Sequence, residues 1–130
     1  MTRLRSCEIF NRDAIEVIEL KQSPNTVIFC DPPYYNSDMG HYSAYTETNF
    51  INLLECLSKT NAKFILTSYP SDSLMEFRER YGWGSKDFKQ IVSVTGKRAE
   101  TLYKTECISY NFIPPNYQPK LFNIIAENEN

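Results

Sequence analysis

The sequence predicts an α/β fold whose sheet is parallel in its first part and antiparallel at one edge. Two continuous apolar runs, 26–30 (TVIFC) and 63–68 (KFILTS), have the composition of strands buried on both faces of a parallel sheet. Segments with helical periodicity precede and follow these runs. Two further strand-like segments, 88–94 and 101–112, follow one another without a helix between them, which is typical of an antiparallel hairpin. A short strand is also expected at 7–10.

Three helices are predicted from apolar spacing and from residues that cap helix ends. The first begins at Asp13 and runs to about residue 21, with Glu16 at the spacing of a capping box. The second helix has an apolar face at the spacing i, i+3, i+4 and i+7, made of Phe50, Leu53, Leu54 and Leu57. The third opens with Ser73 and Glu76, again at capping-box spacing, and ends at Gly82.

The composition is that of one globular domain. The chain has 130 residues, of which 42% are hydrophobic and 14% aromatic, enough for a modest core. The sequence contains no signal-peptide pattern and no apolar run long enough to span a bilayer, so we expect a soluble, cytoplasmic protein without a membrane partner. The cysteines are far apart and the chain has a single histidine, which favours buried free thiols over a metal site or disulfides. They are Cys7, Cys30, Cys56 and Cys107.

The charge of the chain is unevenly distributed. A net charge of −2 gives little support to DNA binding, because free-standing DNA-binding domains are usually basic. The segment 86–104 nevertheless has five basic and two acidic residues, a local excess of +3: Lys86, Lys89, Lys97, Arg98 and Lys104 against Asp87 and Glu100. A solvated face and a phosphate-contacting surface explain this run about equally well.

Asp31-Pro32-Pro33-Tyr34 follows the first apolar strand directly. The prolines fix the backbone and hold Asp31 extended, so a carboxylate, carbonyl groups and an aromatic ring are presented rigidly where α/β sheets bind ligands. Asp31 and the Pro32 carbonyl can accept both hydrogens of a nucleobase amino group, which frees the nitrogen lone pair for attack. Tyr34 can stack on the base, worth about 1–3 kcal/mol. A base inside a duplex must flip out to reach such a site. A rigid turn without chemistry is the structural alternative.

This row resembles the catalytic motif of the N6-adenine DNA methyltransferases, which use S-adenosylmethionine. Three further stretches are similar to segments of the DNA adenine methylase family: 41–50 (HYSAYTETNF), 63–69 (KFILTSY) and 96–112 (GKRAETLYKTECISYNF). The resemblance extends from about residue 7 to residue 112. It implies a partial Rossmann-like methyltransferase fold, with a mostly parallel sheet and an antiparallel edge hairpin. Residues 1–115 would be the C-terminal part of the catalytic domain, and residues 116–130 a tail.

The resemblance also implies roles for individual residues. The target amino group would be held by Asp31 and the Pro32 carbonyl, and the flipped adenine would stack on Tyr34. The implied catalytic residues are Asp31, Pro32, Pro33 and Tyr34. The implied substrate contacts are Tyr34, Tyr45, Lys97 and Arg98. The implied cofactor contacts are Asp13 and Asp31, although a plain helix N-cap explains Asp13 at least as well.

The sequence departs from the family in its cofactor loop. Neither the glycine-rich loop that holds the methionine part of S-adenosylmethionine nor a target-recognition domain has a counterpart among the 130 residues, whose glycines are Gly40, Gly82, Gly84 and Gly96. We therefore expect the catalytic-motif part of a restriction-modification type enzyme, inactive alone, with DNA and either an N-terminal chain or a second copy as partners. The alternatives are a non-catalytic nucleic-acid-binding or interaction module, or the same chemistry on RNA or a protein amide.

Overall fold

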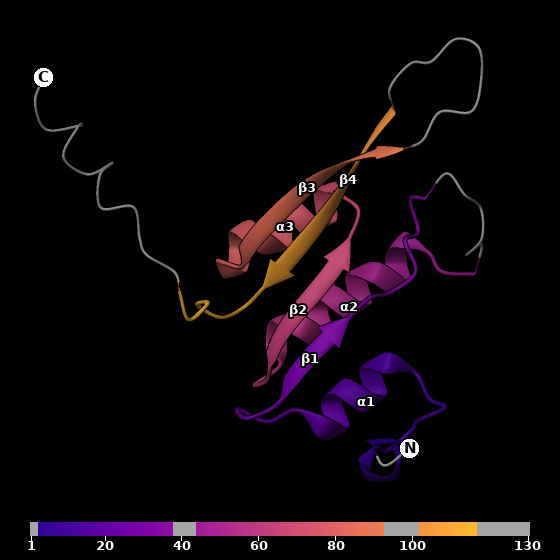
Figure 1. Cartoon of the computed structure of the whole chain (residues 1–130), viewed down its shortest axis with the longest axis vertical. Helices are drawn as coiled ribbons and strands as arrows, with labels where there is room; N and C mark the ends of the chain where they lie inside the picture. Colours follow the sequence, from indigo (N-terminus) through magenta and orange to yellow (C-terminus); the bar gives the residue numbers. More distant parts are fainter. Residues whose placement is uncertain (1–2, 38–43, 93–101, 117–130) are drawn as a thin grey trace, which may run out of the picture.

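The structure, a computed structural model, describes residues 3–37, 44–92 and 102–116. It is an α/β fold, as predicted (Figure 1). The elements in chain order are the short 3-10 helix η1 (Arg3–Ser6), α1 (Ala14–Lys21), β1 (Val27–Cys30), α2 (Glu47–Lys59), β2 (Lys63–Ser68), α3 (Asp72–Tyr81), β3 (Gly84–Val92) and β4 (Leu102–Tyr110).

The four strands form one mixed sheet in the order β1-β2-β4-β3. β1 and β2 are parallel, whereas β4 is antiparallel to both of its neighbours. The predicted edge hairpin is therefore confirmed, but the expectation of a mostly parallel sheet is wrong. The reason is the position of β4: it lies between β2 and β3, so one reversed strand makes two antiparallel pairs.

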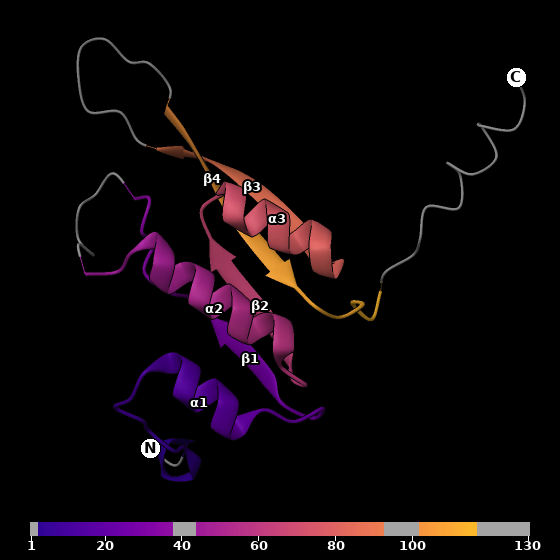
Figure 2. The ribbon, with the colours of Figure 1, turned by 180° about the vertical axis from the view of Figure 1, so that it is seen from behind.

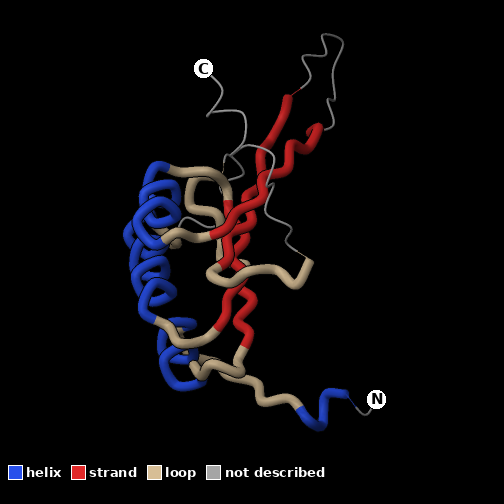
Figure 3. Tube along the Cα trace, turned by 90° about the vertical axis from the view of Figure 1, so that its left-hand side faces the viewer, coloured by secondary structure: helices blue, strands red, loops and turns tan. Residues whose placement is uncertain are grey.

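The three α-helices lie on one face of this sheet (Figures 2 and 3). Side chains therefore alternate along β2 between the helices and the opposite face. Phe64, Leu66 and Ser68 are buried, whereas Ile65 and Thr67 are only partly covered. The face that carries Ile65 and Thr67 has no α-helix over it among the described residues.

The core forms where β2 and β4 meet α2 and α3. The predicted apolar face of α2 is buried in full: Phe50, Leu53, Leu54 and Leu57. It packs with Phe64, Leu66, Leu74, Phe77 and Trp83. Thr46 caps α2 through a capping box with Asn49, which the sequence pattern did not predict. α3 ends at Gly82 as predicted, with this glycine in the left-handed conformation (φ 62°).

Two predicted capping boxes are absent. Asp13 does cap α1, but its carboxylate accepts a hydrogen bond from the Ile15 amide, and no bond from Glu16 completes a box. α3 is capped by Ser71, whose hydroxyl accepts from the Leu74 amide at 3.2 Å, so Ser73 lies inside the helix. Both errors have one cause: capping-box spacing is met by several residue pairs, and the backbone geometry selects among them.

Three strand predictions need correction. Residues 7–10 are irregular, and Ile9 is 87% exposed, because no described strand lies beyond β1 to pair with them. β1 is not buried on both faces: Phe29 is 67% exposed. β3 begins at Gly84 rather than at Phe88, because Gly84 pairs with Tyr110 and leaves room for that ring, which would stand 2.1 Å from an added Cβ.

Candidate active site

The predicted Asp31–Tyr34 turn follows the carboxyl end of β1 and is tied to β2. Asp31 Oδ1 accepts a hydrogen bond of 2.7 Å from the Thr67 hydroxyl. A longer contact of 3.4 Å joins the same oxygen to the Tyr34 hydroxyl. Thr67 Oγ1 also lies 3.3 Å from the Cys30 carbonyl, so its hydroxyl bridges two consecutive residues of the chain. The neighbouring strand therefore holds the Asp31 carboxylate in a defined orientation.

Tyr34 is the first member of an aromatic and cationic cluster. Its ring lies against Tyr69, with centroids 4.4 Å apart and an interplanar angle of 59°. The Lys104 ammonium group lies 5.6 Å from the centroid of the Tyr69 ring. Burial, with contributions from Asp31 and Glu106, raises the pKa of Tyr34. The Tyr34 hydroxyl is therefore protonated at neutral pH and can donate a hydrogen bond.

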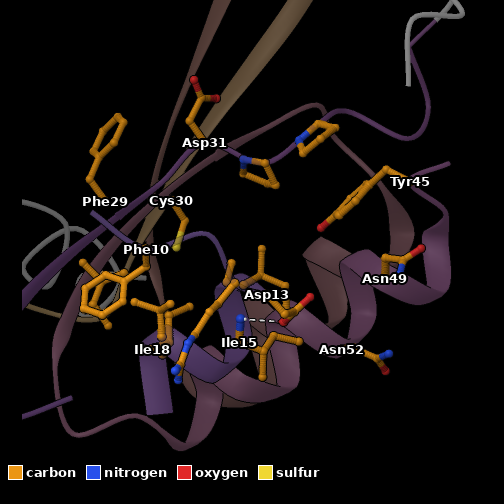
Figure 4. Close-up of a pocket in the computed structure, with 17 residues that line it drawn as sticks. Phe10, Asp13, Ile15, Ile18, Phe29, Cys30, Asp31, Tyr45, Asn49 and Asn52 are labelled. Atoms are coloured by element: carbon orange, nitrogen blue, oxygen red, sulfur yellow. Dashed lines mark hydrogen bonds between the residues drawn. The ribbon is translucent and has the colours of Figure 1, made fainter. Parts of the chain in front are cut away.

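A cavity of about 700 Å³ opens beside β1, bounded by the first turns of α1 and α2 (Figure 4). Apolar side chains make part of its wall, among them Phe10, Ile15, Ile28 and Leu53. Its polar lining includes Asp13, Tyr45, Asn49 and Asn52. In Figure 4 the Cys30 thiol and the Tyr45 hydroxyl point into this space, whereas the Asp31 carboxylate points away from Asp13. Asp31 also lines the cavity, so one strand end carries both the carboxylate and part of the cavity wall.

Two groups that line the cavity remain uncharged at neutral pH. Burial, with the nearby Cys30 and Asp13, raises the pKa of Tyr45 to about 12. Burial and the neighbouring Cys56 raise the pKa of Cys30 to about 11. Both therefore offer a neutral hydroxyl or thiol to a ligand, and Asp13 supplies negative charge on the same wall.

Asp13 is placed by its role as a helix cap. Its Oδ1 accepts a hydrogen bond of 2.8 Å from the Ile15 amide, drawn as a dashed line in Figure 4. The N-cap interpretation of Asp13 is therefore confirmed. The same side chain lines the cavity, so the cofactor contact implied by the family resemblance stays a prediction.

The other predicted site residues are distributed between these two places. Pro32, Pro33 and Tyr45 line the cavity. Lys97 and Arg98 lie outside the described residues, so their predicted substrate contacts stay predictions.

Sequence reasoning missed Thr67, Tyr69 and several cavity residues. Alternation along β2 places Thr67 on the same face as Ile65, but its pairing with Asp31 follows from the register, in which Cys30 lies beside Leu66. Lys104 was part of the predicted basic run, but nothing in its local sequence indicates the contact with Tyr69. That contact joins β4 to the residue that follows β2, and only the strand order brings the two together.

Two classes of feature are absent from the described part of the chain. It contains no group of three or more histidine, cysteine or acidic side chains able to hold a metal ion. None of its helices has the length and apolar character needed to cross a membrane. Comparison of the chain with protein-family models, curated proteins and solved structures found no match.

Proposed function

We propose that this chain is the catalytic-motif part of a site-specific DNA adenine-N6 methyltransferase, with S-adenosylmethionine as methyl donor. The observation that carries the proposal is the Asp31–Tyr34 turn, whose carboxylate is held by Thr67 at the end of two parallel strands. The proposal extends to a Rossmann-like relationship of the fold, a cytoplasmic location and a role in restriction-modification. It also includes a second chain or copy that contributes the missing cofactor loop.

Asp31 would activate the adenine amino group by accepting its hydrogens. Oδ1 already accepts from Thr67, and no described residue donates to Oδ2, which leaves that oxygen for the substrate. The Pro32 carbonyl, fixed by the two proline rings, would be the second acceptor. With both N–H groups held, the nitrogen lone pair is less delocalised into the ring and can attack a methyl group. As the N–C bond forms, the bond from the methyl group to sulfur would break and the nitrogen would become positively charged. Asp31 need not be a strong base, because this cationic nitrogen loses its proton readily.

Tyr34 would provide the stacking surface for the flipped adenine. One side of its ring is in contact with Tyr69, so the base would stack on the side that Tyr69 leaves free. Aromatic stacking of this kind contributes about 1–3 kcal/mol per base. The neutral hydroxyl of Tyr34 also avoids placing a second negative charge beside Asp31.

The cavity beside β1 suits the nucleoside part of S-adenosylmethionine. Its volume of about 700 Å³ is that of a small-molecule site, and its lining is largely apolar with a few polar groups. Asp13, Asn49 and Asn52 could hold ribose hydroxyls and adenine edges, and Phe10 and Ile28 could pack on the ring. When bound, the cofactor supplies an electrophilic methyl group on a sulfonium centre. The residues of this chain would position it and exclude water.

The base-capture step can be tested with two nucleosides that differ in the hydrogens that they offer. Deoxyadenosine carries a 6-amino group with two hydrogens, whereas deoxyinosine carries a 6-carbonyl and a single N1–H, so only the former can donate from one nitrogen to both Asp31 and the Pro32 carbonyl. In NMR titrations we expect the chain to bind deoxyadenosine more tightly, and Asp31→Asn to remove the preference. Glu79→Gln, an exposed charge change on α3, is the control. Equal binding of the two nucleosides by the unaltered chain would contradict the proposal.

Variants at position 34 test the stacking step. Tyr34→Phe keeps the ring and should change deoxyadenosine binding little. Tyr34→Ala should weaken binding by the stacking contribution, about 1–3 kcal/mol. Equal losses for the two variants would exclude stacking as the role of Tyr34.

Methyl transfer itself requires the cofactor to be held in line with the amino nitrogen. With labelled S-adenosylmethionine and adenine-containing DNA, we expect no incorporation by the chain alone, since the glycine-rich loop has no counterpart in its sequence. Cofactor binding by the chain should fall on Asp13→Asn, which keeps an oxygen that can cap α1 but removes the charge. It should be unaffected by Glu16→Gln, which removes a charge from the same helical turn. Turnover by the isolated chain would show that the loop is dispensable.

An interaction module is the second candidate, favoured by the exposed apolar residues of β1. Val27 and Phe29 are 63% and 67% exposed on a strand that ends the described sheet. A module of this kind would bind neither deoxyadenosine nor S-adenosylmethionine, so the titrations above separate the two candidates.

A further inference from the structure

We infer that the nucleic-acid strand carrying the target base crosses the end of the sheet from Asp31 toward Lys104. In this arrangement Lys104 contacts the phosphate next to the target nucleotide, and Tyr69 positions the Tyr34 ring. The inference rests on the proposed function and adds to it a path for the strand. It draws on contacts of Tyr69 and Lys104, which the base-capture chemistry does not use.

The residues of this path share the face of the sheet that carries no α-helix. The registers pair Phe29 with Ile65 and Thr67 with Ile108. Because Phe64 and Leu66 are buried against the helices, the alternating positions on the neighbouring strands face the other way. Thr67 and Lys104 therefore lie on one face of the sheet. They lie near the carboxyl ends of β1 and β2, which Asp31 and Tyr69 directly follow.

Tyr69 connects the two ends of the path. The Tyr69 ring contacts the Tyr34 ring at a centroid distance of 4.4 Å. The Lys104 ammonium group lies 5.6 Å from the centroid of the Tyr69 ring. The Asn36 amide donates a hydrogen bond of 3.0 Å to the Pro70 carbonyl, which ties the segment after Tyr34 to the segment after Tyr69. The two tyrosine rings are in contact, so a base cannot lie between them, and Tyr69 acts as a support behind Tyr34.

Lys104 is free to bind an anion. It has no ion-pair partner among the described residues. A hollow of about 200 Å³ lies beside it, lined also by Asn36, Tyr69, Pro70 and Thr105. Sites for single-stranded nucleic acid combine an aromatic ring with a neighbouring cation in this way, the cation contacting the backbone. The pairing of Lys104 with Tyr69 therefore fits a phosphate contact one step from the stacked base.

A second lysine provides a matched control. Lys86 in β3 lies 5.2 Å from the centroid of the Phe88 ring, so it too is a lysine over an aromatic ring. Its register partner is Ile108, which places it on the same face as Lys104. Among the described residues the Phe88 ring contacts neither Tyr34 nor Tyr69, so Lys86 lies outside the cluster formed by Tyr34, Tyr69 and Lys104. Both lysines lose the same charge on substitution by glutamine.

The experiment measures binding of a fluorescent single-stranded deoxyoligonucleotide, one adenine among thymines, to the full chain over a range of salt concentrations. Lys104→Gln should weaken binding and lower the slope of log affinity against log salt by about 0.7, the value for one lost phosphate contact on a single strand. Lys86→Gln should leave the slope unchanged. A normal slope for Lys104→Gln, or equal losses for both variants, would overturn the inference.

A nucleoside arm separates this inference from the proposed function. Deoxyadenosine has no phosphate, so its binding should be insensitive to Lys104→Gln and sensitive to Asp31→Asn. If Asp31→Asn has no effect, the proposed base capture fails. If Asp31→Asn acts but Lys104→Gln leaves oligonucleotide binding unchanged, only the path fails. If the unaltered chain binds neither ligand, both are wrong.

Tyr69 is tested as a positioning residue. Tyr69→Leu should lower deoxyadenosine binding about fivefold or more, because Tyr34 loses the ring behind it. Tyr69→Phe should restore binding, since the supporting ring is kept. Thermal unfolding of both variants should match that of the unaltered chain. Loss of binding in Tyr69→Phe as well would contradict a support by ring contact.

Discussion

β1 and β2 have similar apolar sequences but different surroundings. In β1 the side chain of Phe29 is 67% exposed, whereas Phe64 in β2 is 0% exposed. β2 has a strand on each side and helices over one face, but β1 ends the described sheet. The burial of an apolar strand is therefore set by its number of neighbours, which its own composition does not report.

The helices α1 and α2, beside these strands, also differ in how many side chains they bury. α1 buries only Ile18, whereas α2 buries four apolar side chains. The candidate site lies on the border between the two regions, because Asp31 follows the exposed strand and Thr67 belongs to the buried one. The Thr67 hydroxyl, on the well-packed strand β2, thus orients the Asp31 carboxylate, which follows the more exposed strand β1.

The two regions should differ most in the loss of stability caused by a matched pair of phenylalanine substitutions. Phe64→Ala should lower the free energy of unfolding by about 3–5 kcal/mol, because it leaves a cavity in the core next to Trp83. Phe29→Ala should change it by about 0.5 kcal/mol or less, since most of its side chain is already in water. Urea denaturation measures both values. Similar losses would mean that Phe29 is covered in solution.

Alkaline pH should destabilise the fold by an intermediate amount. The pKa of Cys30 is raised by burial from 9.0 to about 11, so the folded state keeps a proton that the unfolded state loses. The stabilisation is complete below pH 9 and is lost as the pH rises toward 11, on the order of 3 kcal/mol at most. Urea denaturation at each pH follows this change. Burial likewise raises the pKa of Cys107 to about 11, so this thiol contributes in the same pH range. Cys30→Ser, which does not titrate there, should make the profile shallower, and an unchanged slope would exclude Cys30 as a source.

Helix caps should show a smaller effect that differs between the regions. Ser71→Ala removes the cap of α3, a helix that contributes to the core, and should cost about 1 kcal/mol of global stability. Asp13→Ala removes the cap of the weakly buried α1 and should mainly speed amide hydrogen exchange within that helix. Hydrogen exchange read together with urea denaturation distinguishes the two outcomes. Uniform exchange changes throughout the chain for Asp13→Ala would contradict a loosely coupled α1.

Surface ion pairs should give the smallest effect and no difference between the regions. Glu8 pairs with Lys21 beside α1, and Glu76 pairs with Arg80 on α3; all four side chains are largely exposed. Glu8→Ala and Glu76→Ala should each lower stability by about 0–1 kcal/mol, because water and salt screen such pairs. At high salt, urea denaturation should no longer detect even this small loss of stability. A larger loss at either position would indicate packing by the acidic side chain.

Much of the local structure could be predicted from the sequence. The limits of β2 and the buried face of α2 follow from residue pattern alone, because helical and strand periodicities report which side of an element is apolar. The start of β3 was missed, because the pairing of Gly84 with Tyr110 involves a residue 26 positions away. The irregular form of 7–10 was missed for a related reason: an apolar alternation forms a strand only where a partner strand exists.

The sequence by itself determined the chemistry that is available: a carboxylate, two prolines and a tyrosine in a rigid row after a strand. Chain stiffness at the prolines is a local property, and so it can be read from neighbouring residues. Only the tertiary structure decided that Thr67 orients Asp31 and that Tyr69 and Lys104 continue the row. These contacts join three strands, and their partners are set by strand order and register, which depend on the packing of the whole sheet.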